Sequence, residues 1–529
     1  MYRTMTDRSS GAVLGWTFIA VVVLVFAAPV TVLAWSLVDP ATEVWRQLWQ
    51  TRLPGMIVDT LVLLVAVVVG TVVVGTGLAW LVSAYDFAGR KVVSWLLVTP
   101  LAIPGYVGGF VWLDSLSNVF GARGVRSMWL CAVVLTVSLY PYVYLFARAA
   151  FADQGADTLA AARSLGSGPV GVFLRVAVPA ARPAIAAGAA LVAMEVLTDI
   201  GTVRLFNVST LSDGVMRVWF DTGDRGAATE LASALTGGAI LLVAVERLMR
   251  RGVRRARRAS ETPLAPRMLA RAGSSVVLGV TLSVLLVAVV IPLVRLIDWT
   301  FEARSAGQTA TVAGGVGHHV WSTLVLAGIA TIVCIVVGTL LALVVTHRGR
   351  SARVIGRLAT LGYAMPGPVV AVGAVMTLAA LDRRGWLPDG FLLVGSLVGL
   401  LFALVTRFFA VSYQGVEASL DRLTPSALES ARVLGAGPVR TAMTVEVPAA
   451  RYGLLAATAL LCVDLVKELP ITLLLRPFGI DTLAVWVWQA TSESLWSQAA
   501  VPSLLMVAVG MVAVGVLLAA LERGGEFTS

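Results

Sequence analysis

The sequence predicts an all-α membrane protein with about 12 transmembrane helices, arranged as two parallel halves of six. Three observations predict this class: a very apolar composition, a series of long apolar runs, and a segment that occurs twice. Of the 529 residues, 58% are hydrophobic and only 13% are charged, and the mean hydropathy is +0.88. So few charged side chains could not cover the surface of a soluble protein of this length.

The first apolar run illustrates why these runs are expected to cross a membrane. Residues Gly11 to Val38 contain no charged side chain, and a helix needs about 20 mainly apolar residues to span the hydrocarbon core. The apolar region of a cleaved signal peptide has only about 7 to 15 residues, so we expect this run to be retained as a helix. The twelve runs lie at 12–37, 57–84, 92–113, 128–147, 181–198 and 231–246, and at 273–298, 320–346, 355–380, 391–414, 450–466 and 499–521.

Positive charge is concentrated between the two sets of runs. The net charge is +10, and an excess of Arg and Lys marks the cytoplasmic loops of membrane proteins. This predicts a cytoplasmic linker at 251–271 between a first half at 1–250 and a second half at 272–529. Both termini are then expected in the cytoplasm, with the chain in a bacterial plasma membrane, in contact with lipid and not with nucleic acid. The basic cluster comprises Arg247, Arg250, Arg251, Arg254, Arg255, Arg257 and Arg258.

A segment of about fifty residues occurs in both halves. Its two copies align without a gap, so one constant separation along the chain, the repeat spacing, relates each residue to its counterpart. The alignment indicates that one ancestral unit was duplicated and fused. Because each half enters the membrane in the same sense, the repeat is expected to be parallel and not inverted. The aligned pairs include Gly166 and Gly435, Pro179 and Pro448, and Trp219 and Trp488.

Each copy contains a short loop before the fifth apolar run of its half, at 157–179 and at 426–448. An Ala- and Leu-rich stretch is followed by a Gly that can end a helix and a Pro that can begin the next turn. Such a helix-turn-helix suits docking onto a partner at the cytoplasmic face, and a simple connector is the alternative. The repetition of the loop favours docking.

The two loops resemble the EAA loop of binding-protein-dependent ABC importer permeases, the element that contacts the ATPase subunits. The second copy keeps the leading acid as Glu429, whereas the first has Ala160 at that place. The resemblance implies two ATP-binding subunits at the cytoplasmic face and a substrate-binding protein outside, with ATP on the partners and no cofactor on this chain. The residues that it assigns to ATPase coupling are Ala161, Ala162, Gly166 and Pro179 in the first loop, and Glu429, Ala431, Gly435 and Pro448 in the second.

Further segments narrow the resemblance to fused ferric iron permeases. Residues 100–106, 194–202 with 219–221, and 467–483 are together similar to that type. The resemblance implies a permease subunit that imports ferric iron, with two six-helix halves in one chain. Thiamine, a polyamine or a phosphonate are alternative cargoes, because fused relatives for these share the architecture. An ion-coupled secondary transporter with six plus six helices is an alternative of another class.

The sequence contains no phosphate-binding loop of the Gly-x-x-x-x-Gly-Lys-Ser/Thr type. The chain has only two lysines, Lys91 and Lys467, and neither follows a Gly in that frame. A chain without such a loop cannot cradle ATP phosphates in this way. We therefore expect a translocation subunit that is not itself an enzyme.

Acidic residues within apolar runs, or directly after them, are also paired by the repeat spacing. Glu195 pairs with Asp464, and Asp199 pairs with Glu468. Within each half the two acids are four residues apart, which places both carboxylates on one face of a helix. Charges at membrane depth are costly unless they are paired or wetted. The acids, together with Lys467, therefore predict a translocation pathway whose oxygen ligands suit a ferric ion or another cation.

The alternative interpretation is that these acids lie at the outer helix ends and bind the segments that follow. Gly201 and Pro470 favour it slightly, because they suggest that the helices end there. Arg476 is, like Lys467, a candidate counter-ion. Residues 201–229 and 469–497 are expected outside the membrane, either as re-entrant turns or a docking face for the binding protein, or as aromatic anchors at the interface.

Two Pro-Gly pairs and two adjacent histidines complete the sequence features. Pro104–Gly105 and Pro366–Gly367 interrupt the third and ninth runs at similar places, as in broken membrane helices that form gates, although Gly and Pro are also common in membrane helices generally. His318 and His319 would diverge by about 100° on a helix, so they are not expected to share a metal. The three cysteines are scattered singly, as buried apolar residues would be.

Overall fold

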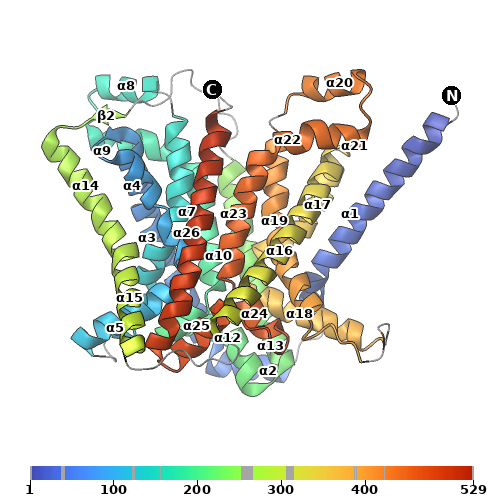
Figure 1. Ribbon diagram of the computed structural model, residues 1–529, viewed down its shortest axis with the longest axis horizontal. Helices are drawn as coiled ribbons and strands as arrows, with labels where there is room; N and C mark the ends of the chain where they lie inside the picture. The colour runs from blue at the N-terminus through green and yellow to red at the C-terminus, as the bar shows by residue number, and fades with distance from the viewer. Residues whose placement is uncertain are drawn as a thin grey trace.

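The computed structural model describes residues 3–36, 38, 42–121, 125–154, 156–251, 266–305, 315–385, 388, 390–421 and 423–526. Almost all of these residues lie in helices, which confirms the predicted all-α class (Figure 1). The two described strands, β1 (Tyr85–Asp86) and β2 (Arg267–Met268), form one short parallel pair. Most of the predicted linker, with Arg254, Arg255, Arg257 and Arg258 of the basic cluster, lies outside the described residues.

Long helices alternate with short ones in both halves. The first half contains α1 (Arg3–Ser36), α2 (Thr42–Thr51), α3 (Leu53–Ala84), α4 (Arg90–Leu96), α5 (Gly105–Phe120), α7 (Met128–Ala152), α8 (Ala156–Ser164), α9 (Pro169–Val172), α10 (Val178–Thr198), α11 (Gly201–Leu205), α12 (Leu211–Arg217) and α13 (Arg225–Arg251). The second half contains α14 (Arg271–Leu285), α15 (Ile291–Ser305), α16 (Gly315–Thr346), α17 (Arg350–Ala359), α18 (Gly367–Asp382), α19 (Leu397–Leu420), α20 (Pro425–Val433), α21 (Pro438–Thr441), α22 (Val447–Ala449), α23 (Arg451–Val466), α24 (Pro470–Leu475), α25 (Leu483–Ser492) and α26 (Trp496–Glu526). Short 3₁₀ turns cover Thr99–Ala102 and Thr360–Ala364, and π turns cover Phe173–Ala177, Val218–Thr222, Leu286–Val290 and Ala442–Glu446.

Helices long and apolar enough to cross a membrane make this a multi-pass membrane protein. Within the described residues there are 8 such helices, or up to 11 if each of three bent helix pairs is one span. All but one of the predicted apolar runs lie in these segments. The exception is the run at 231–246 in α13, part of which lies outside the residues whose side chains the structure describes. The described residues thus supply up to 11 spans, and the twelfth stays a prediction.

Two of the bent pairs break at the predicted Pro-Gly pairs. The chain bends by 90° between Arg90–Ala102 and Gly105–Ser117, and by 105° between Ser351–Tyr363 and Gly367–Asp382. Proline has no amide hydrogen and disfavours a helical conformation in the residue before it. Accordingly, the residues before the two prolines are extended, with ψ of 111° and 141°. The predicted interruptions are confirmed.

The duplicated segment has the same local structure in both halves. The repeat spacing separates the first residues of α8 and α20, of α9 and α21, of the π turns that follow them, and of α11 and α24. Each copy thus runs from a short helix through a tight turn toward a long helix: directly into α10 in the first half, and through α22 and a bend of 67° into α23 in the second. The duplication predicted from the sequence is therefore also a structural repeat.

The spacing changes after α24. The hydroxyls of Thr210 and Thr482 cap α12 and α25 in the same way. The first amide N–H of each of these helices also donates to a Thr hydroxyl at an equivalent place in α3 or α16, at 2.9 and 2.8 Å. The two capping threonines are three positions further apart than the repeat spacing, so the second half has an insertion before α25. The ungapped alignment is wrong in this region, and Trp219 and Trp488 are not structurally equivalent.

The outer helices of the two halves are exchanged. α1, from the first half, packs against the second, with the Phe26 ring 4.7 Å from that of Phe409. α15, from the second half, packs against the first, where the Trp299 ring lies 5.6 Å from that of Phe110. Figure 1 shows α1 beside α16 to α18 at one side of the molecule, and α14 and α15 beside α3 to α5 at the other. Each half thus packs against an outer helix of the other half.

The two ends of the bundle carry different elements. α8 and α20 lie at one end, together with the start of α1 and the end of α26, whereas α12, α24 and α25 lie at the opposite end (Figure 1). This arrangement agrees with a parallel repeat whose two loops share one side. It also places 201–229 and 469–497 on the side opposite those loops, as the sequence predicts. The assignment of the loop side to the cytoplasm stays a prediction.

α3 and α7 approach each other closely at Gly75. A Cβ atom at this position would lie 2.8 Å from the carbonyl oxygen of Tyr140 and 2.9 Å from Cβ of Val143. A Cβ atom at Gly77, in the same helix, would meet nothing within 4 Å. The absence of a side chain at Gly75 therefore permits the contact between these two helices.

We expect Gly75→Val to lower the free energy of unfolding by about 1–3 kcal/mol, because an added side chain forces the two helices apart. Gly77→Val is the matched control and should leave stability nearly unchanged. The measurement is thermal unfolding of the detergent-solubilised full chain, followed by size-exclusion chromatography. Equal midpoints for the two variants would contradict the close approach of α3 and α7.

Candidate functional site

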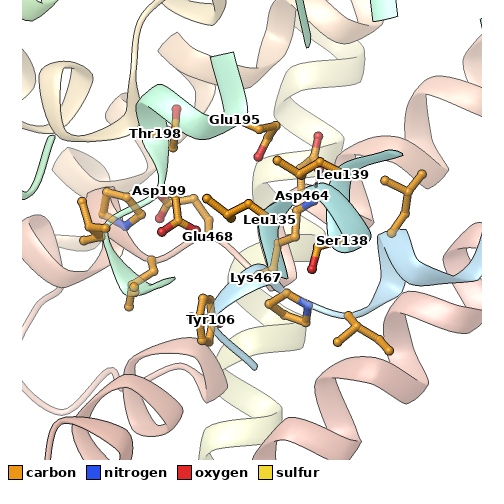
Figure 2. Close-up of a pocket in the computed structure, with 18 of the residues that line it drawn as sticks. Tyr106, Leu135, Ser138, Leu139, Glu195, Thr198, Asp199, Asp464, Lys467 and Glu468 are labelled. Carbon is orange, nitrogen blue, oxygen red and sulfur yellow. Dashed lines mark ion pairs between the residues drawn. The ribbon is translucent and has the colours of Figure 1, made fainter. Parts of the chain in front are cut away.

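A cavity of about 90 Å³ lies between the two halves, beside the break at Pro104. It can hold several water molecules, because each needs roughly 10–15 Å³ of such volume. Figure 2 shows the polar side chains that converge on it from both halves. The charged residues that line it are Glu195, Asp199, Arg407, Asp464, Lys467 and Glu468. The structure thus brings together all five of the predicted pathway residues.

Asp199 follows the last residue of α10 and caps the short helix α11. Its Oδ1 accepts hydrogen bonds from the amide N–H groups of Thr202 and Val203, at 2.8 and 3.1 Å, and its Oδ2 accepts one from the hydroxyl of Thr202 at 2.7 Å. A carboxylate at a helix N-terminus satisfies amides that have no partner within the helix. Asp199 therefore supports the alternative interpretation, in which the acids lie at helix ends and bind the segments that follow.

Glu468 does the same in the second half. Its two carboxylate oxygens accept hydrogen bonds from the amides of Ile471 and Thr472, at 2.8 and 3.0 Å, and from the hydroxyl of Thr472 at 2.8 Å. Its Oε1 also lies 3.7 Å from a guanidinium nitrogen of Arg407. These contacts fix the start of α24. Like Asp199, Glu468 has a clear structural task at the wall of the cavity.

The other two acids are arranged differently. Oδ1 of Asp464 lies 3.0 Å from Nζ of Lys467, which also donates to the hydroxyl of Tyr142 at 3.5 Å. Glu195 is within electrostatic range of Lys467, Asp464 and Arg407, but within the described part of the chain it has no hydrogen bond or ion pair. Figure 2 shows the Glu195 and Asp464 carboxylates on the same side of the cavity as the Lys467 amine. This group is the part of the site that fits the pathway interpretation.

Sequence reasoning missed Arg407, which belongs to α19 and is only 8% exposed. Its Nη2 donates to the hydroxyl of Thr198 at 3.3 Å, and the same hydroxyl accepts from the amide of Gly367 at 3.4 Å. A single Arg within the apolar run 391–414 was the signal that could have identified it, because an intramembrane charge marks a functional site by default. Its guanidinium lies where first-half and second-half helices meet.

Two other predicted features lie away from the cavity. Arg476 pairs with Asp481, so the prediction that it is a counter-ion of the four acids is wrong. The two adjacent histidines face different acceptors: His318 Nε2 lies 2.9 Å from the carbonyl oxygen of Gly479, and His319 Nδ1 lies 3.0 Å from that of Gly315. Their rings are nearly perpendicular, as expected for side chains that diverge from neighbouring positions.

The backbone of the duplicated loop is the same in both copies. Gly166 and Gly435 have φ of +84° and +80°, the left-handed conformation that favours glycine. After each glycine, the amide of the next residue donates to a carbonyl oxygen five residues earlier, that of Ala162 at 3.1 Å or Ala431 at 3.0 Å. This is the hydrogen bond with which a left-handed glycine commonly ends a helix. The sequence therefore correctly identified where both loop helices stop.

The loops present apolar side chains to their surroundings. Leu165 and Leu434, at equivalent positions, are 85% and 84% exposed. Two more equivalent pairs are also exposed: Val170 with Val439, and Leu174 with Met443. The predicted coupling residues differ in exposure: Ala161 and Glu429 are exposed, Ala162 is half-buried and Ala431 is buried. Pro179 and Pro448 lie in the first turns of α10 and α22. Exposed apolar groups at matched positions are typical of interaction surfaces.

We expect Glu468→Gln to lower the free energy of unfolding by about 1–2 kcal/mol, because a glutamine can accept at only one of the two oxygens that cap α24. Glu195→Gln, the same substitution at the acid without hydrogen bonds in the described residues, should leave stability unchanged. Thermal unfolding of the two purified variants tests this. A larger loss of stability for Glu195→Gln than for Glu468→Gln would mean that Glu195, and not Glu468, has the structural role.

Curated relatives of this chain are transport permeases, although no protein-family profile matches it. The Fe(3+)-transport system permease protein FbpB 2 of Haemophilus influenzae is 26% identical over 471 residues, which cover 87% of this chain and 88% of that protein. A probable molybdenum ABC transporter permease protein of Haloferax volcanii is 30% identical over 253 residues, 46% of this chain and 89% of that protein. The sulfate transport system permease protein CysT of Escherichia coli is 25% identical over 249 residues, 43% of this chain and 87% of that protein.

The coverage of these relatives fits the structural repeat. The molybdenum and sulfate relatives match over nearly their whole length but over less than half of this chain, as expected if the chain holds two units of their size. The ferric relative instead matches across both halves. Together with the apolar helices and the two equivalent loops, this similarity means that the chain belongs to the permease proteins of ABC transporters, with two permease halves in one chain.

Proposed function

We propose that this chain is the translocation subunit of an ATP-driven importer of ferric iron in a bacterial plasma membrane. The observation that carries the proposal is the match to the Fe(3+)-transport permease over 87% of the chain, which extends across both halves. Relatives named for other cargoes match about half of the chain or less. The cargo would pass between the halves, through the cavity that both of them line.

ATP is bound on partner subunits, because the chain has no phosphate-binding loop. Two ATP-binding subunits would dock on α8 and α20, one on each, where the exposed leucines supply apolar contact area. The first loop leads through a π turn directly into α10, whereas the second leads through a π turn and α22 into α23, with a bend of 67° between Pro438–Ala449 and Arg451–Val466. Both long helices end at the cavity, at Glu195 to Asp199 or at Asp464 to Glu468. A helix of about 20 residues is roughly 30 Å long. Movement of a docked subunit would therefore be transmitted along this helix to the cavity.

The composition of the cavity supports a cationic cargo. Its lining holds four carboxylates and two basic side chains, so acidic groups are in excess. Carboxylate oxygens are hard ligands, of the kind that metal ions such as ferric iron prefer. A substrate-binding protein would deliver the iron at the opposite end of the bundle, where α12, α24 and α25 lie (Figure 1).

An oxyanion is the second candidate cargo. Relatives are named for molybdenum, for sulfate and for 2-aminoethylphosphonate, and Arg407 and Lys467 would attract an anion such as a phosphonate. The excess of carboxylates opposes this alternative. Thiamine and polyamines are also cations, so the excess of carboxylates does not separate them from iron; the match to the Fe(3+)-transport permease favours iron.

Uptake into membrane vesicles tests the proposal. The tagged chain is purified with its bound partners, reconstituted, and supplied with radiolabelled ferric iron on the side of α24 and α25, with and without ATP. Recovery of an ATPase and ATP-dependent iron entry are the expected results. An ATPase whose transport follows sulfate or phosphonate would keep the class and change the cargo, and uptake without any ATPase would indicate an ion-coupled secondary transporter.

We expect the double variant Leu165→Asp and Leu434→Asp to reduce ATP-driven uptake at least about tenfold, because buried apolar anchors dominate the energy of protein interfaces. Met268→Asp is the control, since this side chain is also exposed but lies outside the two loops. Copurification of the ATPase and uptake are measured together. Normal uptake by the double variant would contradict the proposal that the loops dock the ATP-binding subunits.

A further inference from the structure

The basic residues of the cavity break the symmetry of the repeat. The repeat spacing matches each acid of the cavity with an acid in the other half, but it matches Arg407 with Ser138 and Lys467 with Thr198. All four of these residues line the same cavity. The two cations therefore belong only to the second half, and small hydroxyl residues occupy the corresponding places in the first.

Each cation has one acidic partner in its own half and one hydroxyl partner in the other. Arg407 lies 3.7 Å from Glu468 and donates to Thr198 of α10 at 3.3 Å. Lys467 lies 3.0 Å from Asp464 and donates to Tyr142 of α7 at 3.5 Å. The hydrogen bonds of these cations across the cavity thus go to neutral oxygens of the first half, and the carboxylate of Glu195 in that half attracts both cations without a direct contact.

These two kinds of contact differ in how easily they break. Separating a buried cation from its carboxylate leaves two uncompensated charges, which is strongly unfavourable. A bond of 3.3 or 3.5 Å to a neutral hydroxyl is long for a hydrogen bond, and water in the cavity can replace it. If the halves move apart, we expect each cation to stay with its acid and to leave its hydroxyl.

We propose that Arg407 and Lys467 form a latch that closes the passage between the two halves by binding Thr198 and Tyr142. This inference rests on the proposed transport function, because a latch has a use only if the passage runs between the halves. Thr198 also accepts from the amide of Gly367, the first residue of α18 after its break. The latch therefore joins α10, α18 and α19 at one point. When the latch opens, these helices separate. Each cation then keeps its acidic partner, so no charge is left unpaired.

The test removes only the two hydroxyl groups, with Thr198→Val and Tyr142→Phe in one chain. The control chain carries Thr76→Val and Tyr140→Phe, whose hydroxyls are buried and have no hydrogen-bond partner within the described residues. Both chains also carry Ser138→Cys in the cavity, with the three native cysteines replaced by alanine. The full chain is placed in lipid vesicles, and the rate of labelling by a charged, membrane-impermeant thiol reagent is measured without ATP or cargo.

We expect the Thr198→Val and Tyr142→Phe chain to label at least about fivefold faster than its Ser138→Cys parent, because loss of the latch shifts the population toward open states. The control chain should label at the parent's rate. Equal rates for all three chains would overturn the proposal, and so would an equal increase in the control. If the double variant is not folded on size-exclusion chromatography, the two single variants are compared in its place. Since the assay uses neither iron nor an ATPase, its result is independent of the cargo experiment above.

Discussion

The interior of this protein is governed by the cost of placing charge in a membrane. Six charged side chains line one small cavity between the halves, and a charge at that depth is tolerated only if it is paired, hydrogen-bonded or wetted. Asp199 and Glu468 are satisfied by the first amides of the short helices α11 and α24. Asp464 forms an ion pair with Lys467. Only Glu195 relies on the cavity itself, within the described residues.

This constraint also explains the shape of the surrounding chain. A carboxylate can cap a helix only where a helix begins, so the long helices end at the cavity and short ones start there. The breaks at Pro104 and Pro366 bring further helix ends to the same region. A cavity lined by helix ends differs from one lined by unbroken helices, because its walls contain free amides and hinges as well as side chains.

Much of the fold could be predicted from the sequence, because the membrane imposes a simple pattern on it. The apolar runs, the Pro-Gly breaks and the glycines that end α8 and α20 all depend on local chemistry, and the structure confirms them. The run at 231–246 stays a prediction, because part of it lies outside the residues whose side chains are described. The insertion before α25 was missed, since a chance match of Trp219 with Trp488 concealed it.

The contacts of the site could be predicted only in part. The spacing of the acids correctly placed them together, but spacing alone cannot distinguish a carboxylate that caps a helix from one that faces a cavity. That difference depends on where the chain turns after position 199 or 468. Arg407 was missed for a related reason: its partners lie in two other helices, one of them in the other half, and sequence periodicity carries no information about such contacts.

The exchange of outer helices and the shared cavity imply that the two halves are related by an axis that passes through the cavity. In a permease made of two identical chains, any residue near that axis meets its own copy. An arginine there would face a second arginine, and the repulsion between like charges would select against it. Gene fusion removes this restriction, because each half can then change independently. The match of Arg407 with Ser138, and of Lys467 with Thr198, is a difference that two identical chains could not acquire.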